Sequence, residues 1–134
     1  VRFTGFRPDA KKLLPGADAV LMTSLQEGMP LALLEAMSAG VPVITTPWLG
    51  ASELLDGGRL GRVLPDWEPQ SIVRALHTAV ECPGMLNASA QEAMSVARSR
   101  YDISVTVREH ERLYRRLLAE RKPGAPTARV RQTV

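Results

Sequence analysis

The sequence predicts an α/β fold in which a parallel sheet is covered by helices. Two observations predict it: short runs of apolar and β-branched residues alternate with longer segments of helical composition, and glycines and prolines separate the two kinds of segment. Such an alternation is typical of strand-helix-strand units whose neighbouring strands run parallel. With 134 residues, the chain has the length of one domain with a modest core.

The first third of the chain carries the strand-helix-strand unit. Residues 1–3 predict a strand, and residues 19–24 form a short apolar run that ends in small polar residues, as a buried strand does at its carboxyl end. Residues 31–38 have helical composition, and Gly40 follows them as a C-terminal cap. Residues 41–46 predict a second buried strand. We therefore expect a right-handed βαβ crossover, with any ligand beyond the carboxyl ends of the strands.

The remaining residues predict one more strand and a series of helices. A short strand over residues 60–64 follows the turn Asp56-Gly57-Gly58. Helices are expected over residues 70–81, 87–100 and 104–119, the first of them broken off by Pro83-Gly84. Residues 120–134 contain two prolines, a glycine and several basic residues, and they predict a disordered tail.

The segment from Glu27 to Glu35 is the strongest candidate for a functional site. Its two carboxylates lie eight positions apart, on either side of a Gly-x-Pro turn and a run of apolar helix formers. A proline is best tolerated at the start of a helix, so the helix begins near Pro30 or Leu31. The first amides of a helix lack intrahelical partners and lie at the positive end of the helix dipole, which favours a phosphate. A phosphate flanked by two carboxylates that can accept hydrogen bonds from hydroxyl groups suggests a nucleotide sugar.

These residues resemble a known enzyme family. Residues 24–44 are similar, almost position by position, to the E-x7-E region of retaining GT-B glycosyltransferases of family 4. Residues 1–5 resemble the V-x-F-x-G strand of that family, Ala17-Asp18 the A-D start of its next strand, and residues 50–53 its G-G-x-x-E loop. The motifs occur in the order that the family has.

The resemblance implies a fold and a place for this chain in a larger enzyme. It covers residues 1–80 closely and the helices to about residue 118 more loosely, and it implies that residues 1–119 are the C-terminal half of a Rossmann-like GT-B donor domain, followed by C-terminal helices. A GT-B enzyme needs two such domains, and this chain opens on a strand without an initiator methionine. We therefore expect the C-terminal part of a longer protein, inactive on its own. The family's diphosphate-binding Arg and Lys lie upstream of the V-x-F-x-G strand and have no place in this sequence.

The implied activity is retaining transfer of a sugar from a nucleoside diphosphate sugar to a saccharide, a lipid-linked acceptor or a small molecule. Glu27, the expected catalytic residue, would bind hydroxyls of the donor sugar, and Glu35 would bind those of the ribose. The residues that would line the sugar and phosphate are Gly28, Met29, Pro30 and Leu31. Those that would frame the base through backbone contacts are Thr4, Gly5, Phe6 and Arg7. The leaving phosphate would itself help to deprotonate the acceptor, so no metal and no other cofactor is expected.

Simpler roles compete with these assignments. Glu27 could merely stabilise the helix dipole, and Glu35 could lie on a solvated helix face. Glu53 could bind the ligand or cap the helix that follows it. As a whole, the protein could be a GT-B subunit that binds a nucleotide sugar without transferring it. A third possibility is an unrelated flavodoxin-like or response-regulator domain, but the sequence lacks the acidic cluster or hydroxyl-rich phosphate loop of such domains.

The charge is concentrated at one end of the chain. From Arg98 onward ten Lys and Arg face four Asp and Glu, a balance of +6, whereas residues 1–97 carry seven against ten, or −3. The arginines are interleaved with Glu109, Glu111 and Glu120 along one helix, so we expect a solvated helix face and no nucleic-acid partner. Contact with an anionic membrane remains open. The single Cys82 is consistent with a reducing cytoplasm, where we place the protein, with peripheral contact to the inner face of the cell membrane as an option.

Overall fold

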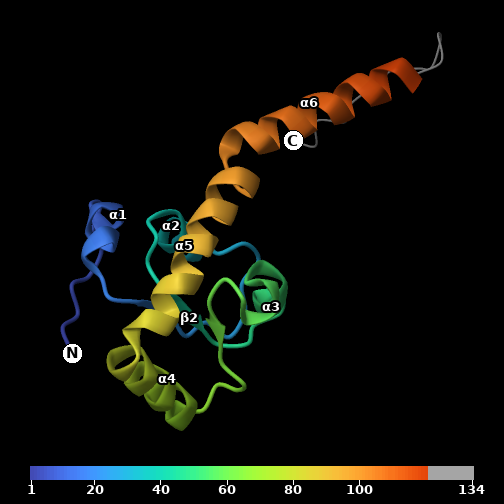
Figure 1. Cartoon of the computed structure of the whole chain (residues 1–134). Coiled ribbons are helices and arrows are strands. Elements are labelled where there is room, and N and C mark those ends of the chain that lie inside the picture. Colours follow the sequence, from blue (N-terminus) through green and yellow to red (C-terminus); the bar gives the residue numbers. More distant parts are fainter. Residues whose placement is uncertain (121–134) are drawn as a thin grey trace, which may run out of the picture. The chain divides into compact units, whose positions relative to one another are not determined.

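A computed structural model describes residues 1–120 of the chain (Figure 1). The chain divides into two compact units, Val1–Tyr101 and Asp102–Val134, and each is described by itself. The elements, in order, are α1 (Ala10–Leu13), the 3₁₀ helix η1 (Leu14–Gly16), β1 (Val20–Met22), α2 (Leu31–Ser38), β2 (Val43–Thr45), α3 (Ala51–Leu54), the 3₁₀ helix η2 (Asp56–Gly58), β3 (Arg62–Val63), α4 (Pro69–Glu81), α5 (Pro83–Arg100) and α6 (Ile103–Glu120). The predicted tail begins at the last residue of α6 and otherwise lies outside the described residues.

The three strands form one parallel sheet in the order β1-β2-β3. Val20 lies opposite Val43 in the first pair, and Ile44 lies opposite Arg62 in the second. Because α2 connects β1 to its neighbour β2, the predicted strand-helix-strand unit is confirmed. Each strand is shorter than the apolar run that predicted it.

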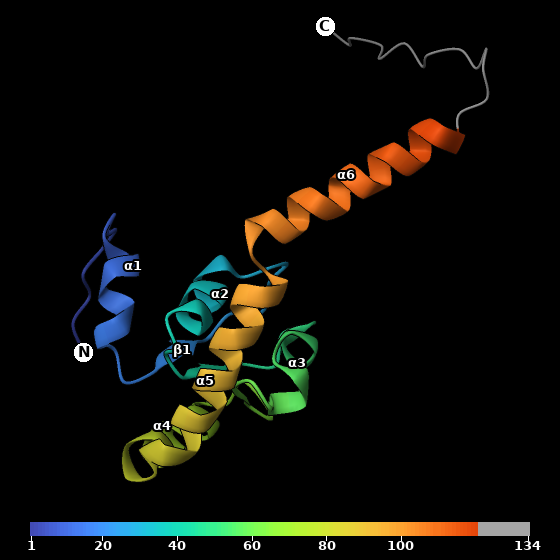
Figure 2. The ribbon, with the colours of Figure 1, turned by 45° about the horizontal axis from the view of Figure 1, so that its top comes forward.

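Helices cover both faces of this sheet, and successive residues of β2 point into two different hydrophobic clusters, one on each face. Val43 packs with residues of α2, α3 and α5, whereas Ile44 packs with residues of α4. Figures 1 and 2 show α5 beside α2 on the first of these faces. The buried residues that these helices add to the first cluster are Leu33, Ala36, Met37, Ala51, Leu54, Ala93 and Ala97. The predicted α/β class, a parallel sheet with flanking helices, is confirmed.

The bounds of α2 are those that the sequence predicts. Pro30 is the N-cap residue, with an extended backbone (φ −74°, ψ 100°), and Ala39 is the C-cap residue. Gly40 follows with φ +71°, a left-handed conformation that costs a glycine little. The loop that leads into α2 therefore lies beyond the carboxyl end of β1, and the helix begins there.

The N-terminal residues depart from the prediction. Residues 1–3 form no strand, and the side chains of Val1 and Phe3 are almost wholly exposed. A three-residue strand must gain enough from pairing and burial to offset the entropy of ordering it, and this segment gains neither. Two helical turns that were not predicted, α1 and η1, follow Pro8 and Asp9.

The C-terminal helices begin earlier than predicted. α4 begins at Pro69 and α5 at Pro83, each with its proline in the first turn, where the missing N–H costs nothing. Pro83 does end the preceding helix, as predicted, but it also starts the next one. Over residues 1–120, no helix has both the length and the apolar character that a membrane span requires.

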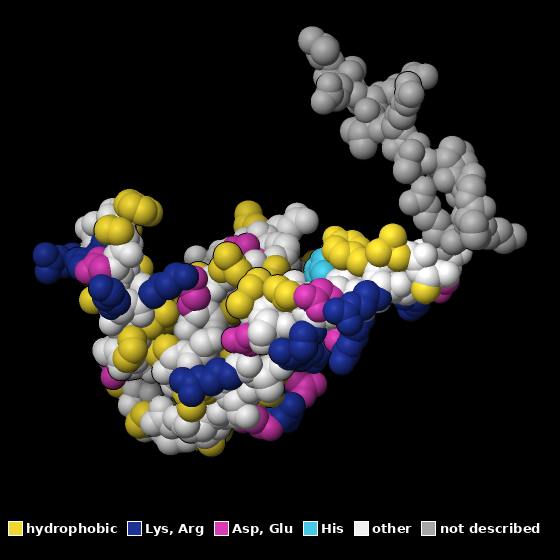
Figure 3. Space-filling model, turned by 90° about the horizontal axis from the view of Figure 1, so that it is seen from above, with side chains coloured by type: hydrophobic (Ala, Val, Ile, Leu, Met, Phe, Trp, Pro, Cys, Tyr) yellow, Lys and Arg dark blue, Asp and Glu magenta, His cyan; other side chains and the backbone are white. Residues whose placement is uncertain are grey.

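The second unit is described only through α6, whose 18 residues include none that is buried. Figure 3 shows hydrophobic side chains gathered along this helix. The exposed large apolar residues of α6 are Ile103, Val107, Leu113, Tyr114, Leu117 and Leu118. Most recur at intervals of three or four positions, so they form one stripe of an amphipathic helix.

Candidate functional site

The two carboxylates of the E-x7-E segment lie at opposite ends of one short stretch of backbone. Glu27 lies on the loop between β1 and α2, and Glu35 lies on the second turn of α2. Both residues are half-buried. A half-buried carboxylate at the carboxyl edge of a parallel sheet is well placed to bind a polar ligand, because such ligands sit in this position in open α/β folds.

Glu27 is held by hydrogen bonds that begin on the neighbouring strand. The hydroxyl of Ser24 donates to Oε1 of Glu27 at 2.6 Å. The backbone carbonyl of Ser24 in turn accepts a hydrogen bond from the hydroxyl of Thr46, also at 2.6 Å. Since Thr46 follows β2 directly and is 1% exposed, the loop that carries Glu27 is fixed to the interior of the sheet.

The N-terminus of α2 is open between the two carboxylates. The carbonyl of Pro30 accepts hydrogen bonds from the amides of Leu33 and Leu34, at 3.1 and 3.2 Å. The amides of the two residues before them, the first of the helix, therefore lack an intrahelical acceptor. Leu31 is 67% exposed, although Pro30 is buried. This end of the helix is accessible to an anion.

Gly28 stands beside this open helix end. A Cβ built on Gly28 would meet no atom within 4 Å, and its φ lies outside the left-handed region. Neither packing nor backbone conformation therefore requires a glycine here. The space that a side chain would fill is free for a ligand to approach the backbone.

Glu35 is paired with a residue that the sequence analysis did not single out. Nζ of Lys11, on α1, lies 2.7 Å from Oε1 of Glu35. The Glu35 side chain is 31% exposed, and the Lys11 side chain is much more so. A groove of about 430 Å³ runs past this pair, and its lining residues are Lys11, Leu14, Leu31, Leu34, Glu35, Ser38, Ala39 and Tyr101. The groove is large enough to receive part of a small ligand beside the carboxylate.

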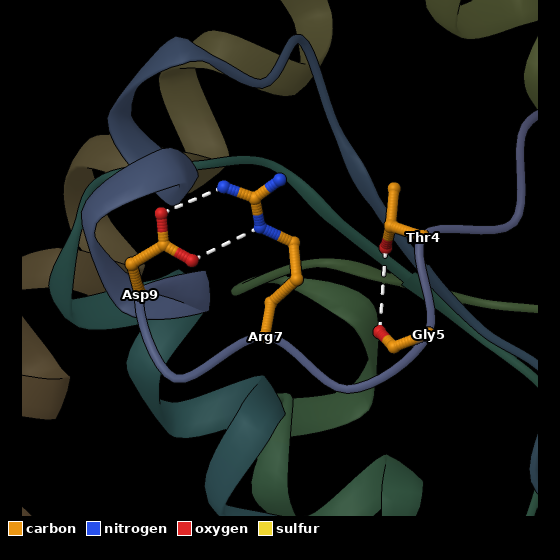
Figure 4. Close-up of polar contacts among 4 residues, drawn as sticks. All are labelled: Thr4, Gly5, Arg7 and Asp9. Carbon is orange, nitrogen blue, oxygen red and sulfur yellow. Dashed lines mark hydrogen bonds and ion pairs between the residues drawn. The ribbon is translucent and has the colours of Figure 1, made fainter.

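The segment predicted to frame a base, Thr4 to Arg7, is exposed in this structure. Figure 4 shows that Arg7 lies against Asp9. Nε of Arg7 donates to Oδ1 of Asp9 at 3.0 Å, and Nη2 donates to Oδ2 at 2.7 Å. This bidentate pair raises the pKa of Arg7 and lowers the pKa of Asp9. The Thr4 hydroxyl lies 3.5 Å from the carbonyl of Gly5. Among the described residues, no hydrogen bond or ion pair joins residues 4–7 to Glu27 or Glu35. The N-terminal segment contacts Glu35 through the ion pair of Lys11.

Glu53 lies inside α3, in its first turn, and is exposed. The interpretation of Glu53 as a helix cap is wrong, because Gly50 is the N-cap residue, with φ +95°, and no side chain caps this helix. A cavity of about 130 Å³ lies between this loop and the E-x7-E loop, and its lining residues are Gly28, Met29, Trp48, Gly50, Glu53, Leu54 and Tyr101. The structure thus places Glu53 on the same cavity as the Gly28-Met29 backbone.

The arrangement can bind a ligand that is anionic at one point and carries hydroxyls on both sides of it. Three residues of this arrangement, Lys11, Ser24 and Thr46, were not predicted as site residues. Ser24 lies in the quoted motif, but its bond to Glu27 depends on the loop conformation, and the roles of Lys11 and Thr46 depend on contacts between distant segments. Within residues 1–120, no group of three His, Cys, Asp or Glu side chains could hold a metal ion.

Comparison with known proteins assigns the family. The profile described as glycosyl transferases group 1 matches residues 1–82 of the 134. The chain belongs to this glycosyltransferase family. The amylovoran biosynthesis glycosyltransferase AmsK of Erwinia amylovora is 34% identical over 84 residues, 57% of this chain and 21% of AmsK. The UDP-Gal:alpha-D-GlcNAc-diphosphoundecaprenol alpha-1,3-galactosyltransferase of Escherichia coli is 48% identical over 42 residues, 31% of this chain and 11% of the relative. The match to curated glycosyltransferases such as AmsK spans about a fifth of their length.

A solved structure agrees with the fold. HepE of Anabaena superposes with a TM-score of 0.77 and 30% sequence identity, over 86% of this chain and 32% of HepE. The HepE structures include complexes with UDP and with UDP-glucose. The expected fold, part of a GT-B-like domain with helices at its C-terminal end, is therefore confirmed.

Proposed function

We propose that this chain forms the donor-binding part of a retaining family 4 glycosyltransferase that uses a UDP-sugar. One observation carries the proposal: two half-buried carboxylates, Glu27 and Glu35, lie on either side of the open N-terminus of α2. The sugar hydroxyls would bind Glu27, the diphosphate would lie along residues 28–31, and the ribose would bind Glu35. HepE, which binds UDP and UDP-glucose, and the Escherichia coli relative named for UDP-Gal support a uridine nucleotide.

In the proposed reaction, the bond between the sugar C1 and the β-phosphate oxygen breaks while the acceptor oxygen attacks C1 from the same face. The acceptor proton passes to the leaving phosphate, so sugar transfer leaves UDP and the glycosylated acceptor. The amides at the start of α2 would stabilise the charge that develops on the diphosphate, and Glu27 would orient the sugar. No step requires a metal or another cofactor. Residues 4–7 would approach the base through their backbone, and Glu53 would contact the ligand from the neighbouring cavity that it lines.

The acceptor is proposed from chemistry rather than from the site. A saccharide, a small molecule and a lipid-linked acceptor all present a hydroxyl, and the Escherichia coli relative is named for a diphosphoundecaprenol acceptor. We favour a lipid-linked acceptor, used by a cytoplasmic enzyme in peripheral contact with the anionic inner face of the membrane. The excess of basic residues after Arg98 supports this location, and we propose no nucleic-acid partner.

Calorimetric titration of the full-length protein that contains this chain tests the donor site. We expect UDP to bind more tightly than GDP or ADP, and Glu35→Ala to weaken UDP binding at least about tenfold, because each charged hydrogen bond to a ribose hydroxyl contributes roughly 1.5–3 kcal/mol. Glu81→Ala, at the exposed end of α4, is the matched control and should leave the affinity unchanged. Unchanged UDP affinity in Glu35→Ala would contradict the ribose assignment.

Lys11→Ala separates a ribose contact from the loss of an ion pair. An exposed ion pair contributes little, so removing Lys11 should change the UDP affinity less than twofold. A loss as large as that in Glu35→Ala would mean that the pair itself, and not the carboxylate, is what the nucleotide needs. Binding of UDP-glucose without release of UDP in the presence of acceptor extracts would instead favour a non-catalytic subunit.

A further inference from the structure

The hydroxyl groups of Ser24 and Thr46 form two hydrogen bonds that connect Glu27 to the end of β2. Ser24 lies two positions after the end of β1, and its hydroxyl donates to Oε1 of Glu27 at 2.6 Å. One oxygen of the carboxylate is thereby occupied by the protein, and Oε2 has no such partner among the described residues. Oε2 can therefore accept a hydrogen bond from a ligand hydroxyl without competing with Ser24.

The spacing Ser-x-x-Glu is also that of a helix capping box, and the structure excludes this simpler explanation. In a capping box the two side chains bond to each other's backbone amides at the start of a helix. Here residues 25–29 are not helical, α2 begins only at Leu31, and the two side chains bond directly to each other. The bond therefore fixes a side chain in a loop and does not begin a helix.

Thr46 fixes the backbone of residues 22–24, from which the loop to Glu27 starts. Its hydroxyl donates to the carbonyl of Ser24 at 2.6 Å, and its amide donates to the carbonyl of Met22 at 3.1 Å. Thr46 is 1% exposed, so these bonds lie in a dry environment. They connect the loop that carries Glu27 to the end of the central strand β2.

We propose that Ser24 and Thr46 are positioning residues for the donor sugar: Thr46 holds Ser24 in place, and Ser24 holds the carboxylate of Glu27 in the orientation that the sugar needs. The inference rests on the proposed function. A glutamate side chain on a loop loses considerable rotamer freedom when it binds a ligand, and a bond made before binding removes part of that cost. The hydroxyl of Ser24 bonds to Glu27 and that of Thr46 bonds to the backbone of Ser24, so removing either hydroxyl should weaken binding of the sugar and not of the nucleotide.

Titration with UDP and with UDP-glucose measures this effect. The glucose gain is the ratio of the dissociation constant of UDP to that of UDP-glucose. In the full-length protein, Ser24→Ala should reduce that gain about three- to tenfold and leave UDP binding within twofold. Ser24→Thr, which keeps the hydroxyl, should retain the gain. Thr46→Val should act like Ser24→Ala, and Thr46→Ser should restore the gain. Ser71→Ala removes a buried hydroxyl on α4 and controls for loss of stability, which thermal unfolding of each variant reports.

The double variant Ser24→Ala, Glu27→Ala decides whether Ser24 acts through Glu27. Residues that act as one unit are not additive, so the double variant should lose no more of the glucose gain than Glu27→Ala alone. Multiplied losses, or equal losses for UDP and UDP-glucose, would overturn the positioning role. A wild-type protein for which glucose adds no affinity would overturn the sugar contact of Glu27 and this inference with it. A protein that binds neither UDP nor UDP-glucose would overturn the proposed function itself.

Discussion

Residues 1–18 and residues 19–46 supply the two halves of the candidate site, and they differ sharply in how they are held. None of the first 18 residues is buried, whereas β2 is buried throughout and α2 buries Leu33, Ala36 and Met37. The half that we propose for the sugar contains its own pairing partners, because β1, α2 and β2 follow one another in the chain. The half that we propose for the base has mostly exposed residues and surface pairs such as Arg7–Asp9, and Leu14 is its partly buried contact with the core. Whether a segment is buried depends on which strands and helices can pack against it as much as on its own residues.

The largest expected effect breaks the buried half. Leu33→Ala removes a fully buried side chain of α2 and should lower the free energy of unfolding by about 2–5 kcal/mol, the transfer and cavity cost of such a truncation. Leu31→Ala, two positions earlier and mostly exposed, should change it by less than about 0.5 kcal/mol. Urea titration of both variants measures the difference. Equal losses would mean that the burial of α2 does not set the stability of this region.

A smaller effect tests the close approach of β2 and the residue before β3. A Cβ on Gly61 would overlap the side chain of Val43 and lie 3.0 Å from its carbonyl oxygen. Gly61→Ala should therefore lower the free energy of unfolding by about 1–3 kcal/mol, the usual cost of overpacking. Gly16→Ala, where a Cβ would meet nothing within 4 Å, is the control. If both variants unfold at the same urea concentration, the sheet has more room than the structure shows.

Gly28→Ala acts on ligand binding and not on folding. The added methyl group enters open space, so stability should stay within about 0.5 kcal/mol of the wild type. The same methyl group would occupy the space in which we place the sugar and diphosphate, so UDP-glucose affinity should fall about tenfold, or about 1.4 kcal/mol. Gly16→Ala again serves as the control in the same titration. Undiminished affinity would place the ligand away from this backbone.

The smallest effect concerns the exposed half. The hydrogen bond from Arg7 lowers the pKa of the Asp9 carboxyl, so any stability from this pair is present above the ordinary pKa of an aspartate, about 3.9, and is lost as the pH falls through the lowered value. Arg7→Ala should return the Asp9 titration, followed by carbon NMR, toward its ordinary range. Because the pair is exposed, unfolding should hardly change near neutral pH. An unaltered Asp9 titration would show that the pair does not form in solution.

Local signals in the sequence predicted the parts of the fold that depend on local chemistry. The bounds of α2 follow from Pro30 and Gly40, and the parallel pairing of β1 with β2 follows from the helix between them. The prediction of a strand at residues 1–3 was wrong, because alternating apolar residues form a strand only where a neighbouring strand can pair with them. α5 begins at Pro83, four positions before its predicted start, because a proline can both end one helix and begin the next.

The candidate site shows the same division. The positions of Glu27 and Glu35 around the start of α2 could be predicted, since they depend on one loop and one helix. The pairing of Lys11 with Glu35 and of Thr46 with Ser24 could not, because 24 and 22 positions separate the partners. Such contacts depend on how the chain folds back on itself, which no short motif encodes.

The central position of β2 has a consequence for hydrogen exchange. A strand that is paired on both sides and wholly buried opens only when much of the domain unfolds, whereas an exposed loop opens locally and often. Thr46, at the end of that strand, therefore belongs to the slowly exchanging part of the molecule, and the loop that it holds belongs to the fast one. Local opening of the exposed residues that follow Ser24 therefore leaves the anchor of this loop, the bond from Thr46 to Ser24, in place.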